Sequence, residues 1–256
     1  MTMFIPVSKA ATICTAESGT QRVPLLELYT SEGCDSCPPT DRWVSALPQR
    51  GYTSKRVIPL AFHVDYWNYL GWQDPYANAA FSARQRAANQ RNKSRVVYTP
   101  QLILDGADYR RGLWRNDFGA HITTINQQQP RAHIRMSIVS GQRLQGTITV
   151  PDTRDRNAAQ IYIALYENGL ATEVRAGENR GKRLAHDFVV RELAGPWMPD
   201  AGGTYSINLP LQFPPHWQTA NLHIAAFAQD LTTGSTMQAL TLPYCSPVRT
   251  TSRQPL

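Results

Sequence analysis

The spacing of hydrophobic residues changes near residue 130 of this chain. Before that point, short apolar runs alternate with longer segments rich in Ala and polar residues, and this pattern predicts strands separated by helices. After it, apolar and polar residues alternate with a period of two, which is typical of half-buried strands. The chain therefore divides into two regions with different secondary structure.

The first region predicts an α/β arrangement with a mainly parallel sheet, because strands that alternate with helices usually pair in parallel. Its apolar runs have the length of buried strands, and the first of them ends in a Ser-Glu-Gly turn. The expected strands are residues 25–29, 57–64 and 101–106, and the expected helices are residues 41–47, 75–91 and 114–128.

The second region predicts an antiparallel β-sandwich, because its short strands are separated by Gly, Pro, Asp and Asn turns and by no helix. The expected strands are residues 133–139, 144–150, 160–166, 187–191, 204–209, 221–228 and 237–242. The corresponding division of the chain is a flexible N-terminal segment or signal remnant over 1–23, an α/β domain over 24–130, an antiparallel β domain over 131–243 and a tail over 244–256.

Composition places the chain among ordinary globular proteins. Of its 256 residues, 42% are hydrophobic and 18% are charged. No apolar run approaches the roughly 18 residues that a membrane span needs, so no span is expected. The net charge is +7, but the basic run from Arg84 to Arg95 comes with no nucleic-acid-binding motif, and we expect it to be the solvated face of a helix. No nucleic-acid partner is expected.

The N-terminal segment leaves the compartment open. Small residues precede a possible cleavage point after Ala16, but Pro6 and Lys9 interrupt the apolar stretch and no basic cluster comes before it. The segment fits a weak signal peptide, a remnant of one or a frayed tail, and it is not evidence for export.

The motif that points to chemistry is Cys34-Asp-Ser-Cys37, which lies between a predicted strand and a predicted helix. The unpaired N–H groups and the dipole of a helix N-terminus stabilise a thiolate. We therefore expect Cys34 to be an exposed nucleophile and Cys37 to be the resolving thiol. Ser36 can donate a hydrogen bond to the thiolate, whereas Asp35 opposes its formation, so the direction of electron flow stays open. A purely structural cysteine pair is the alternative.

Metal and cofactor sites are not expected. The chain has 4 Cys and 6 His, without a second closely spaced Cys pair or a His pair at ligand spacing. A dithiol carries two electrons itself and needs no organic cofactor. Binding of Cu(I) by the pair is a minor option, since no Met or His lies nearby. Cys14 and Cys245 either pair with each other or remain two free thiols.

Two segments resemble the thioredoxin superfamily. Residues 26–39 resemble its active-site segment, and Thr99-Pro100 with the following Gln-Leu-Ile-Leu-Asp-Gly resembles its cis-proline loop. Together with residues 63–75, 97–101 and 177–191, they are similar to the bacterial family catalogued as domain of unknown function twelve-twenty-three. This resemblance implies an α/β thioredoxin-like N-terminal domain followed by an all-β, sandwich-like C-terminal domain, often in exported periplasmic proteins, and it implies no particular substrate.

The resemblance also implies roles for individual residues. A cis Pro100, supported by Thr99, would pack against the dithiol and present its backbone to a substrate chain. Glu27 lies on the strand that leads into the motif and is the candidate for the buried acid that thioredoxins keep behind the dithiol. An ion pair between Glu27 and an arginine is the alternative.

Four residues after the second predicted strand are candidates for a substrate groove, because sites of α/β proteins assemble at the carboxyl ends of parallel strands. They are Asp65, Trp67, Trp72 and Asp74. The alternative is a packed aromatic loop in which Asp74 caps a helix that starts at Pro75. A further polar group, His186, Asp187 and Arg191, forms either a second site or ordinary strand and turn contacts.

The sequence therefore predicts a thiol–disulfide oxidoreductase-like protein. Its substrates would be protein thiols or disulfides, and an unidentified redox partner would exchange electrons with it. The alternative is a non-catalytic protein that binds a partner or peptide and whose Cys34–Cys37 pair is structural.

Overall fold

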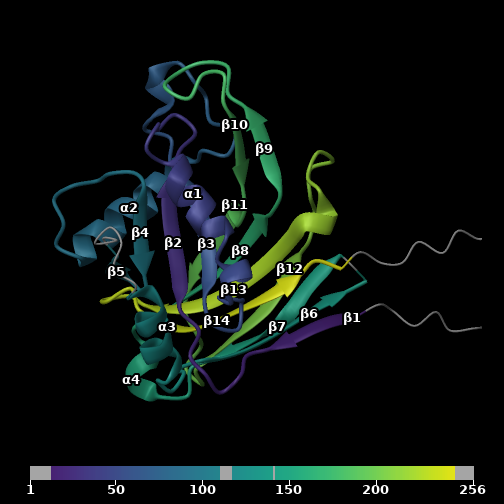
Figure 1. Cartoon of the computed structure of the whole chain (residues 1–256). Coiled ribbons are helices and arrows are strands. Elements are labelled where there is room, and N and C mark those ends of the chain that lie inside the picture. Colours follow the sequence, from purple (N-terminus) through teal and green to yellow (C-terminus); the bar gives the residue numbers. More distant parts are fainter. Residues whose placement is uncertain (1–12, 110–116, 141, 246–256) are drawn as a thin grey trace, which may run out of the picture.

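The computed structural model describes residues 13–109, 117–140 and 142–245 (Figure 1). Its strands are β1 Ile13–Glu17, β2 Leu25–Thr30, β3 Ile58–His63, β4 Gln101–Leu104, β5 Ala107–Asp108, β6 His133–Val139, β7 Arg143–Thr149, β8 Ala159–Glu167, β9 Leu170–Glu173, β10 Arg183–His186, β11 Val189–Trp197, β12 Thr204–Pro210, β13 Leu222–Asp230 and β14 Thr236–Pro243. Its helices are α1 Pro38–Ser45, α2 Ala79–Arg91, α3 Phe118–Asn126 and the single turn α4 Thr153–Arg156, with 3-10 turns η1 Pro48–Arg50, η2 Asn68–Leu70 and η3 Thr219–Asn221.

The predicted fold class is wrong. Strands make up 38% and helices 19% of the described residues, and no α/β thioredoxin-like N-terminal domain stands apart from the rest. One eight-stranded sheet has the order β14-β13-β8-β11-β3-β2-β4-β5, so it takes strands from both sides of residue 130. Within it, only the neighbours β2–β3 and β3–β11 are parallel, which also overturns the expected mainly parallel sheet.

The physical reason lies in strand β3. Each of its residues is buried, so the strand needs a partner along both edges and cover on both faces. Strand β2 pairs with one edge. Strand β11 takes the other edge, where Ala61 N–H donates to the carbonyl of Phe188 at 2.8 Å and Ala61 lies opposite Val189. A buried strand thus joins the two regions into one sheet.

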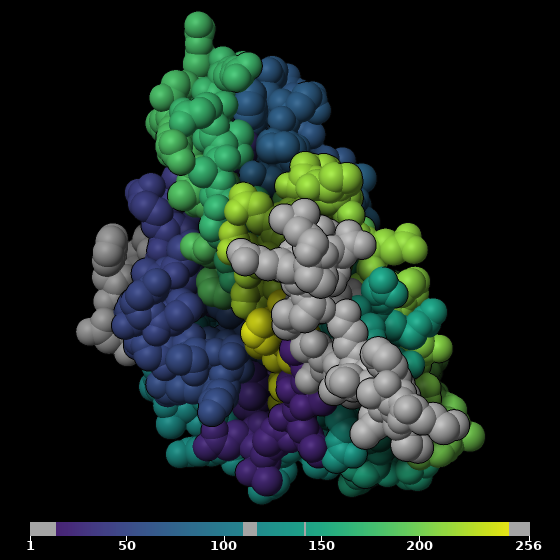
Figure 2. Space-filling model, turned by 90° about the vertical axis from the view of Figure 1, so that its right-hand side faces the viewer, coloured from purple at the N-terminus to yellow at the C-terminus, as the bar shows by residue number. Residues whose placement is uncertain are grey.

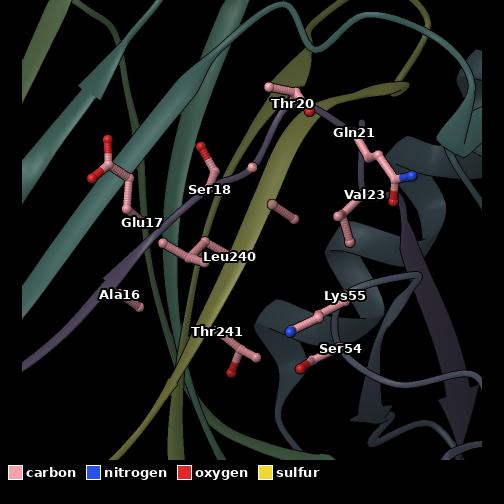
Figure 3. Close-up of a pocket in the computed structure, with 12 residues that line it drawn as sticks. Ala16, Glu17, Ser18, Thr20, Gln21, Val23, Ser54, Lys55, Leu240 and Thr241 are labelled. Carbon is pink, nitrogen blue, oxygen red and sulfur yellow. The ribbon is translucent and has the colours of Figure 1, made fainter.

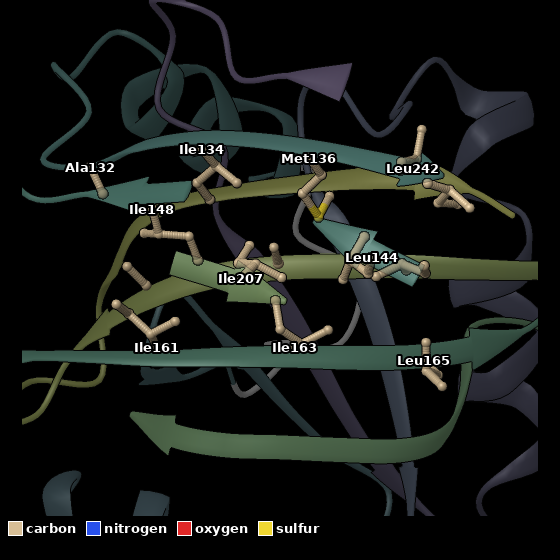
Figure 4. Close-up of a cluster of buried hydrophobic side chains, with 14 of the residues drawn as sticks. Ala132, Ile134, Met136, Leu144, Ile148, Ile161, Ile163, Leu165, Ile207 and Leu242 are labelled. Carbon is tan, nitrogen blue, oxygen red and sulfur yellow. The ribbon is translucent and has the colours of Figure 1, made fainter. Parts of the chain in front are cut away.

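The remaining elements cover this sheet. Helices α1 and α3 pack on Leu26 and Leu28, and helix α2 packs on the opposite face through Phe81 and Ala88. A second sheet, with the order β1-β6-β7-β12, packs against strands β8, β13 and β14. Figure 4 shows its apolar side chains facing those of β8, such as Ile163. The second region therefore does not form a sandwich by itself, because one of the two packed layers is part of the eight-stranded sheet.

Several local predictions are confirmed. Strand β6 spans the predicted residues 133–139, and most other predicted strands differ by one or two residues at their ends, but the strand predicted at 187–191 is β11 and runs on to Trp197. Strand β1 and the β9–β10 hairpin were not expected. Ala16, the possible cleavage point, lies within β1, and Cys14 of the same strand forms a disulfide with Cys245 across a Cα–Cα distance of 6.4 Å.

No helix among the described residues is long and apolar enough to cross a membrane.

Candidate functional site

The cysteines of the Cys34-Asp-Ser-Cys37 motif form a disulfide at the start of helix α1. Their Cα atoms are 5.5 Å apart, and Cys37 is the N-cap residue of the helix. The Ser36 hydroxyl lies 3.4 Å from Cys34 Sγ. Such an adjacent pair is compatible with redox chemistry.

Cys34 is 1% exposed and Cys37 is fully buried, so the prediction of an exposed nucleophile is wrong for this oxidised state. The first turn of α1 also offers fewer donors than expected. Pro38 and Pro39 have no N–H group, and the N–H groups of Thr40 and Asp41 both donate to the carbonyl of Cys37. Stabilisation of a thiolate therefore depends on the helix dipole and on Ser36.

The cis-proline loop lies beside the motif. The Thr99–Pro100 peptide bond is cis, and Gln101 pairs with Tyr29 at the end of the strand that leads into the motif. Trp67 connects the two segments: its Nε1 donates to Thr99 Oγ1 at 2.7 Å, and a Cβ atom on Gly33 would lie 3.0 Å from Trp67 Cβ. A larger residue before Cys34 would therefore push against the Cβ atom and the backbone carbonyl of Trp67.

A loop of the second region also contacts the motif. Asn179, between β9 and β10, is buried and donates to the carbonyl oxygens of Glu32 and Cys34 at 2.8 and 2.9 Å. Glu178 accepts a hydrogen bond from the N–H of Asp35 at 3.2 Å. Figure 2 shows the β9–β10 hairpin (green) beside the segment after β3 (blue) at one end of the molecule. Sequence reasoning missed this role, although residues 177–191 had contributed to the family resemblance.

Five buried titratable side chains gather beside the disulfide, and we call them the His–carboxylate cluster: Glu32, Asp41, His63, Asp74 and His186. His63 Nδ1 lies 2.7 Å from Asp74 Oδ2, which also accepts the N–H of Glu32 at 2.8 Å. His186 Nε2 lies 3.1 Å from Glu32 Oε1, and its Nδ1 lies 3.8 Å from Asp41 Oδ2. The cluster therefore links the turn before Cys34 to the helix after Cys37.

Neighbouring polar groups complete the cluster. Thr30 donates to Asp41 at 2.8 Å, and Trp72 Nε1 donates to Glu32 Oε2 at 2.8 Å. His63 Nε2, by contrast, is buried and has no hydrogen-bond partner among the described residues. Of the five cluster residues, sequence reasoning had singled out only Asp74 and His186 as site candidates.

The pKa values of three cluster residues are shifted in different directions. Burial raises the pKa of Asp41, and the nearby His186 and His63 only partly oppose this rise. Burial by itself would lower the pKa of His63, but the Asp74 carboxylate outweighs it and raises that pKa above its ordinary value. Burial would likewise raise the pKa of Asp74, but His63 brings it below its usual range. The contact thus favours protonated His63 paired with ionised Asp74, while burial favours the protonated form of Asp41.

Glu27 is not part of this cluster. It alternates with Leu26 and Leu28, so its side chain lies on the sheet face opposite α1. There its carboxylate accepts two hydrogen bonds from Arg84, at 2.8 and 2.9 Å, and one from Tyr29 at 2.7 Å. Burial would raise the pKa of Glu27, but Arg84 holds it below the ordinary value. The arginine pair named as the alternative is therefore present.

The other predicted site residues have separate partners. Asp65 accepts the hydroxyl of Ser82 at 2.5 Å. Asp74 is buried rather than open to a groove, and helix α2 starts at Ala79 with Asn78 as its cap, so the predicted start at Pro75 is wrong.

The predicted second polar group is divided in the structure. His186 belongs to the His–carboxylate cluster, whereas Asp187 accepts the N–H of Gly169 at 2.9 Å. Arg191 pairs with Glu167 at 2.7 Å. Only His186 therefore contacts residues next to the motif.

Metal-ligand groups and surface pockets are the other features of the described residues that could form a site. No group of three or more His, Cys, Asp or Glu residues among those described is arranged to hold a metal ion. A pocket of about 540 Å³ lies between β14, residues 16–23 and the turn at Lys55 (Figure 3). Its lining contains no cysteine or histidine.

Comparisons with known proteins agree on the family and the overall fold. The model of the family described as "Protein of unknown function (DUF1223)" matches residues 25–229. A crystal structure of a protein from Agrobacterium tumefaciens is similar at 22% identity and a TM-score of 0.64, covering 89% of this chain and 97% of that one. The structure named HBP35 of Porphyromonas gingivalis is similar at 12% identity and a TM-score of 0.66, covering 93% and 80%. No curated protein matches in sequence.

Proposed function

We propose that this chain, which belongs to the family of unknown function DUF1223, is a thiol–disulfide oxidoreductase that acts through Cys34 and Cys37. The observation that supports the proposal is the disulfide between these two cysteines at the start of α1, flanked in the chain by two members of the buried His–carboxylate cluster, Glu32 and Asp41. A purely structural disulfide needs no proton-carrying groups, whereas a redox-active one releases and takes up protons.

In the oxidising direction, a substrate thiolate attacks Cys34 Sγ. The Cys34–Cys37 bond breaks, a bond forms between Cys34 and the substrate sulfur, and Cys37 leaves as a thiolate that takes up a proton. A second substrate thiolate then attacks the substrate sulfur, which gives a substrate disulfide and releases Cys34. Two substrate thiols are oxidised and one protein disulfide is reduced. The reverse sequence reduces a substrate disulfide.

Asp41 is the proposed proton donor to Cys37. Residues four apart on a helix lie on the same face, with Cβ atoms about 5–6 Å apart. Cys37 and Asp41 have this spacing at the start of α1, and both are buried. Burial raises the pKa of Asp41, which favours its protonated form over that of an ordinary carboxyl group and suits a proton donor. Glu27, which the sequence suggested as the buried acid, instead forms an ion pair with Arg84 on the other face of the sheet.

Trp67, Thr99 and Pro100 are the proposed substrate contacts, because they border the motif where a substrate chain would approach. Since Cys34 is 1% exposed, part of the surrounding surface must move before a substrate sulfur reaches it. The Asn179 loop is held to the motif by two hydrogen bonds and is the segment that we expect to move.

The test is equilibration in glutathione redox buffers, followed by thiol trapping and intact-mass measurement. We expect a reversible two-electron change at Cys34 and Cys37 in the wild type. Cys37→Ser should accumulate mixed disulfides at Cys34, and Cys34→Ser should accumulate few.

The burial of both cysteines favours a second candidate, a binding protein with a structural disulfide. A pair that stays oxidised across the whole buffer range would support that candidate and exclude the oxidoreductase.

A further inference from the structure

The surface beside the disulfide is unusually apolar for this molecule. Among the described residues, five large hydrophobic side chains are exposed, and three of them lie on the two segments that border the motif: Tyr69 at 78%, Val96 at 58% and Val97 at 40%. Tyr69 follows Trp67, and the valines precede Thr99, so the Trp67–Thr99 hydrogen bond holds the two segments together. Large apolar side chains exposed on two segments that are hydrogen-bonded to each other are candidates for a contact surface.

The same segments carry basic side chains. Lys93 and Arg95 are exposed between helix α2 and the cis-proline, and no described carboxylate forms an ion pair with either. Arg86 on α2 is also exposed.

The loop on the other side of the motif is basic as well. Arg175, Arg180 and Lys182 are exposed around Asn179, whose side chain contacts the Cys34 carbonyl. The one acid in this loop, Glu178, is exposed and accepts a hydrogen bond from the N–H of Asp35, whose own carboxylate is also exposed, so two acids stand against six basic side chains on these segments. Basic residues therefore approach the disulfide from two sides, together with aliphatic ones.

We infer that the substrate of this site is a polypeptide segment in which acidic and aliphatic residues flank the reacting cysteine. This inference rests on the proposed function and names its substrate class. Aliphatic side chains of the substrate would cover Val96 and Val97, and its carboxylates would pair with Arg95, Lys93 and Arg180. Charge complementarity of this kind mainly increases the rate of association and excludes basic partners.

The experiment uses two peptides that carry a single cysteine as a mixed disulfide with thionitrobenzoate. One is acetyl-Glu-Val-Glu-Val-Cys-Val-Glu-Gly-amide, and the other has Lys in place of each Glu. In Cys37→Ser protein that keeps its Cys14–Cys245 disulfide, the Cys34 thiolate attacks the peptide sulfur, a Cys34–peptide disulfide forms, and the thionitrobenzoate anion leaves and is measured by absorbance. Rates are divided by those of the same peptides with neutral mercaptoethanol, which removes their intrinsic difference in reactivity.

We expect the acidic peptide to react about tenfold or more faster than its lysine counterpart, with a preference that weakens at high salt. Adding Lys93→Glu and Arg95→Glu should remove most of the preference. Adding Val96→Ser and Val97→Ser should slow both peptides alike. The matched control is Lys55→Glu, an exposed lysine in the pocket away from the motif, and it should change nothing.

Equal rates for the two peptides would overturn the inference while leaving the oxidoreductase proposal intact. A Cys34 that reacts with neither peptide nor with a small disulfide would instead count against the proposed function. The substrate class is then tested by fluorescence anisotropy, with cysteine-to-serine forms of both peptides and the oxidised wild type. If the two peptides bind equally tightly in this anisotropy assay, an acidic partner is excluded whatever the kinetic result.

Discussion

Two buried groups of charged residues lie on opposite faces of the same pair of strands, and they are built differently. On the α2 face, Glu27 and Arg84 match one anion with one cation, and Arg84 also lies over the rings of Phe62 and Tyr162. On the α1 face, the His–carboxylate cluster sets three carboxyl groups against two histidines and leaves His63 Nε2 without a partner. The first arrangement is fixed in one charge state, whereas the second can gain or lose protons.

The matched pair therefore matters for stability, and the His–carboxylate cluster matters for proton exchange. A matched buried pair contributes little net stability relative to an apolar replacement, but it is costly to break. A cluster whose members hold protons with different strength is useful next to a disulfide, because reduction of a disulfide consumes two protons. The disulfide adjoins the cluster and not the Glu27–Arg84 pair.

Breaking the matched pair should give the largest effect on stability. Arg84→Met leaves the Glu27 carboxylate buried without compensation, which costs about 3–5 kcal/mol. Replacing both residues, as Glu27→Leu with Arg84→Met, should recover most of that loss. Urea unfolding measures both values, and a double variant as unstable as the single one would show that the pair is not an isolated unit.

Asp41→Asn should have the largest effect on exchange. It keeps the shape of the side chain but removes its proton, so protonation of Cys37 should slow by about a hundredfold. Single-turnover oxidation of dithiothreitol across a range of pH measures the rate. The matched control is Glu27→Gln on the opposite face, which should lower stability and leave the exchange rate unchanged. Equal slowing in both variants would contradict the role of Asp41.

Asn179→Ala should loosen the loop over the motif. It removes two hydrogen bonds to buried carbonyl groups, which costs about 2 kcal/mol at roughly 1 kcal/mol each. We expect the disulfide to be reduced several-fold faster because the loop opens more often. Asn208→Ala, on exposed strand β12, is the control for removal of a surface amide. Unchanged reduction kinetics would show that another segment controls access.

The smallest effect is the pH dependence of the His63–Asp74 pair. The folded-state pKa of His63 is raised, so its contribution is complete below pH 6.5 and is lost as the pH rises through the folded value. The folded-state pKa of Asp74 is lowered, so its contribution is present above pH 3.8 and is lost as the pH falls through the folded value. Unfolding free energy should therefore decline above pH 6.5, and Asp74→Asn should flatten this decline. Urea titrations at a series of pH values provide the measurement.

The local features of the site could be predicted from the sequence. The Cys-x-x-Cys motif between a strand and a helix depends on residues close together in the chain, and the cis bond at Pro100 was expected from the family resemblance. The sequence did not show which face of the sheet the Glu27 side chain lies on. Alternation along a strand shows which residues share a face but not which face meets α1. Burial of Cys34 was not decided either, since its cover includes a loop about 145 residues further along the chain.

The sequence by itself determined where strands and helices form, because hydrophobic periodicity and turn residues act over a few positions. It also determined the cysteine motif and the family. Only the tertiary structure decided that β3 pairs with β11, that Asn179 and His186 reach the disulfide, and that Glu27 faces Arg84. The physical reason is that strand pairing and side-chain burial minimise the free energy of the whole chain, and contacts between distant residues leave no periodic signal in either segment.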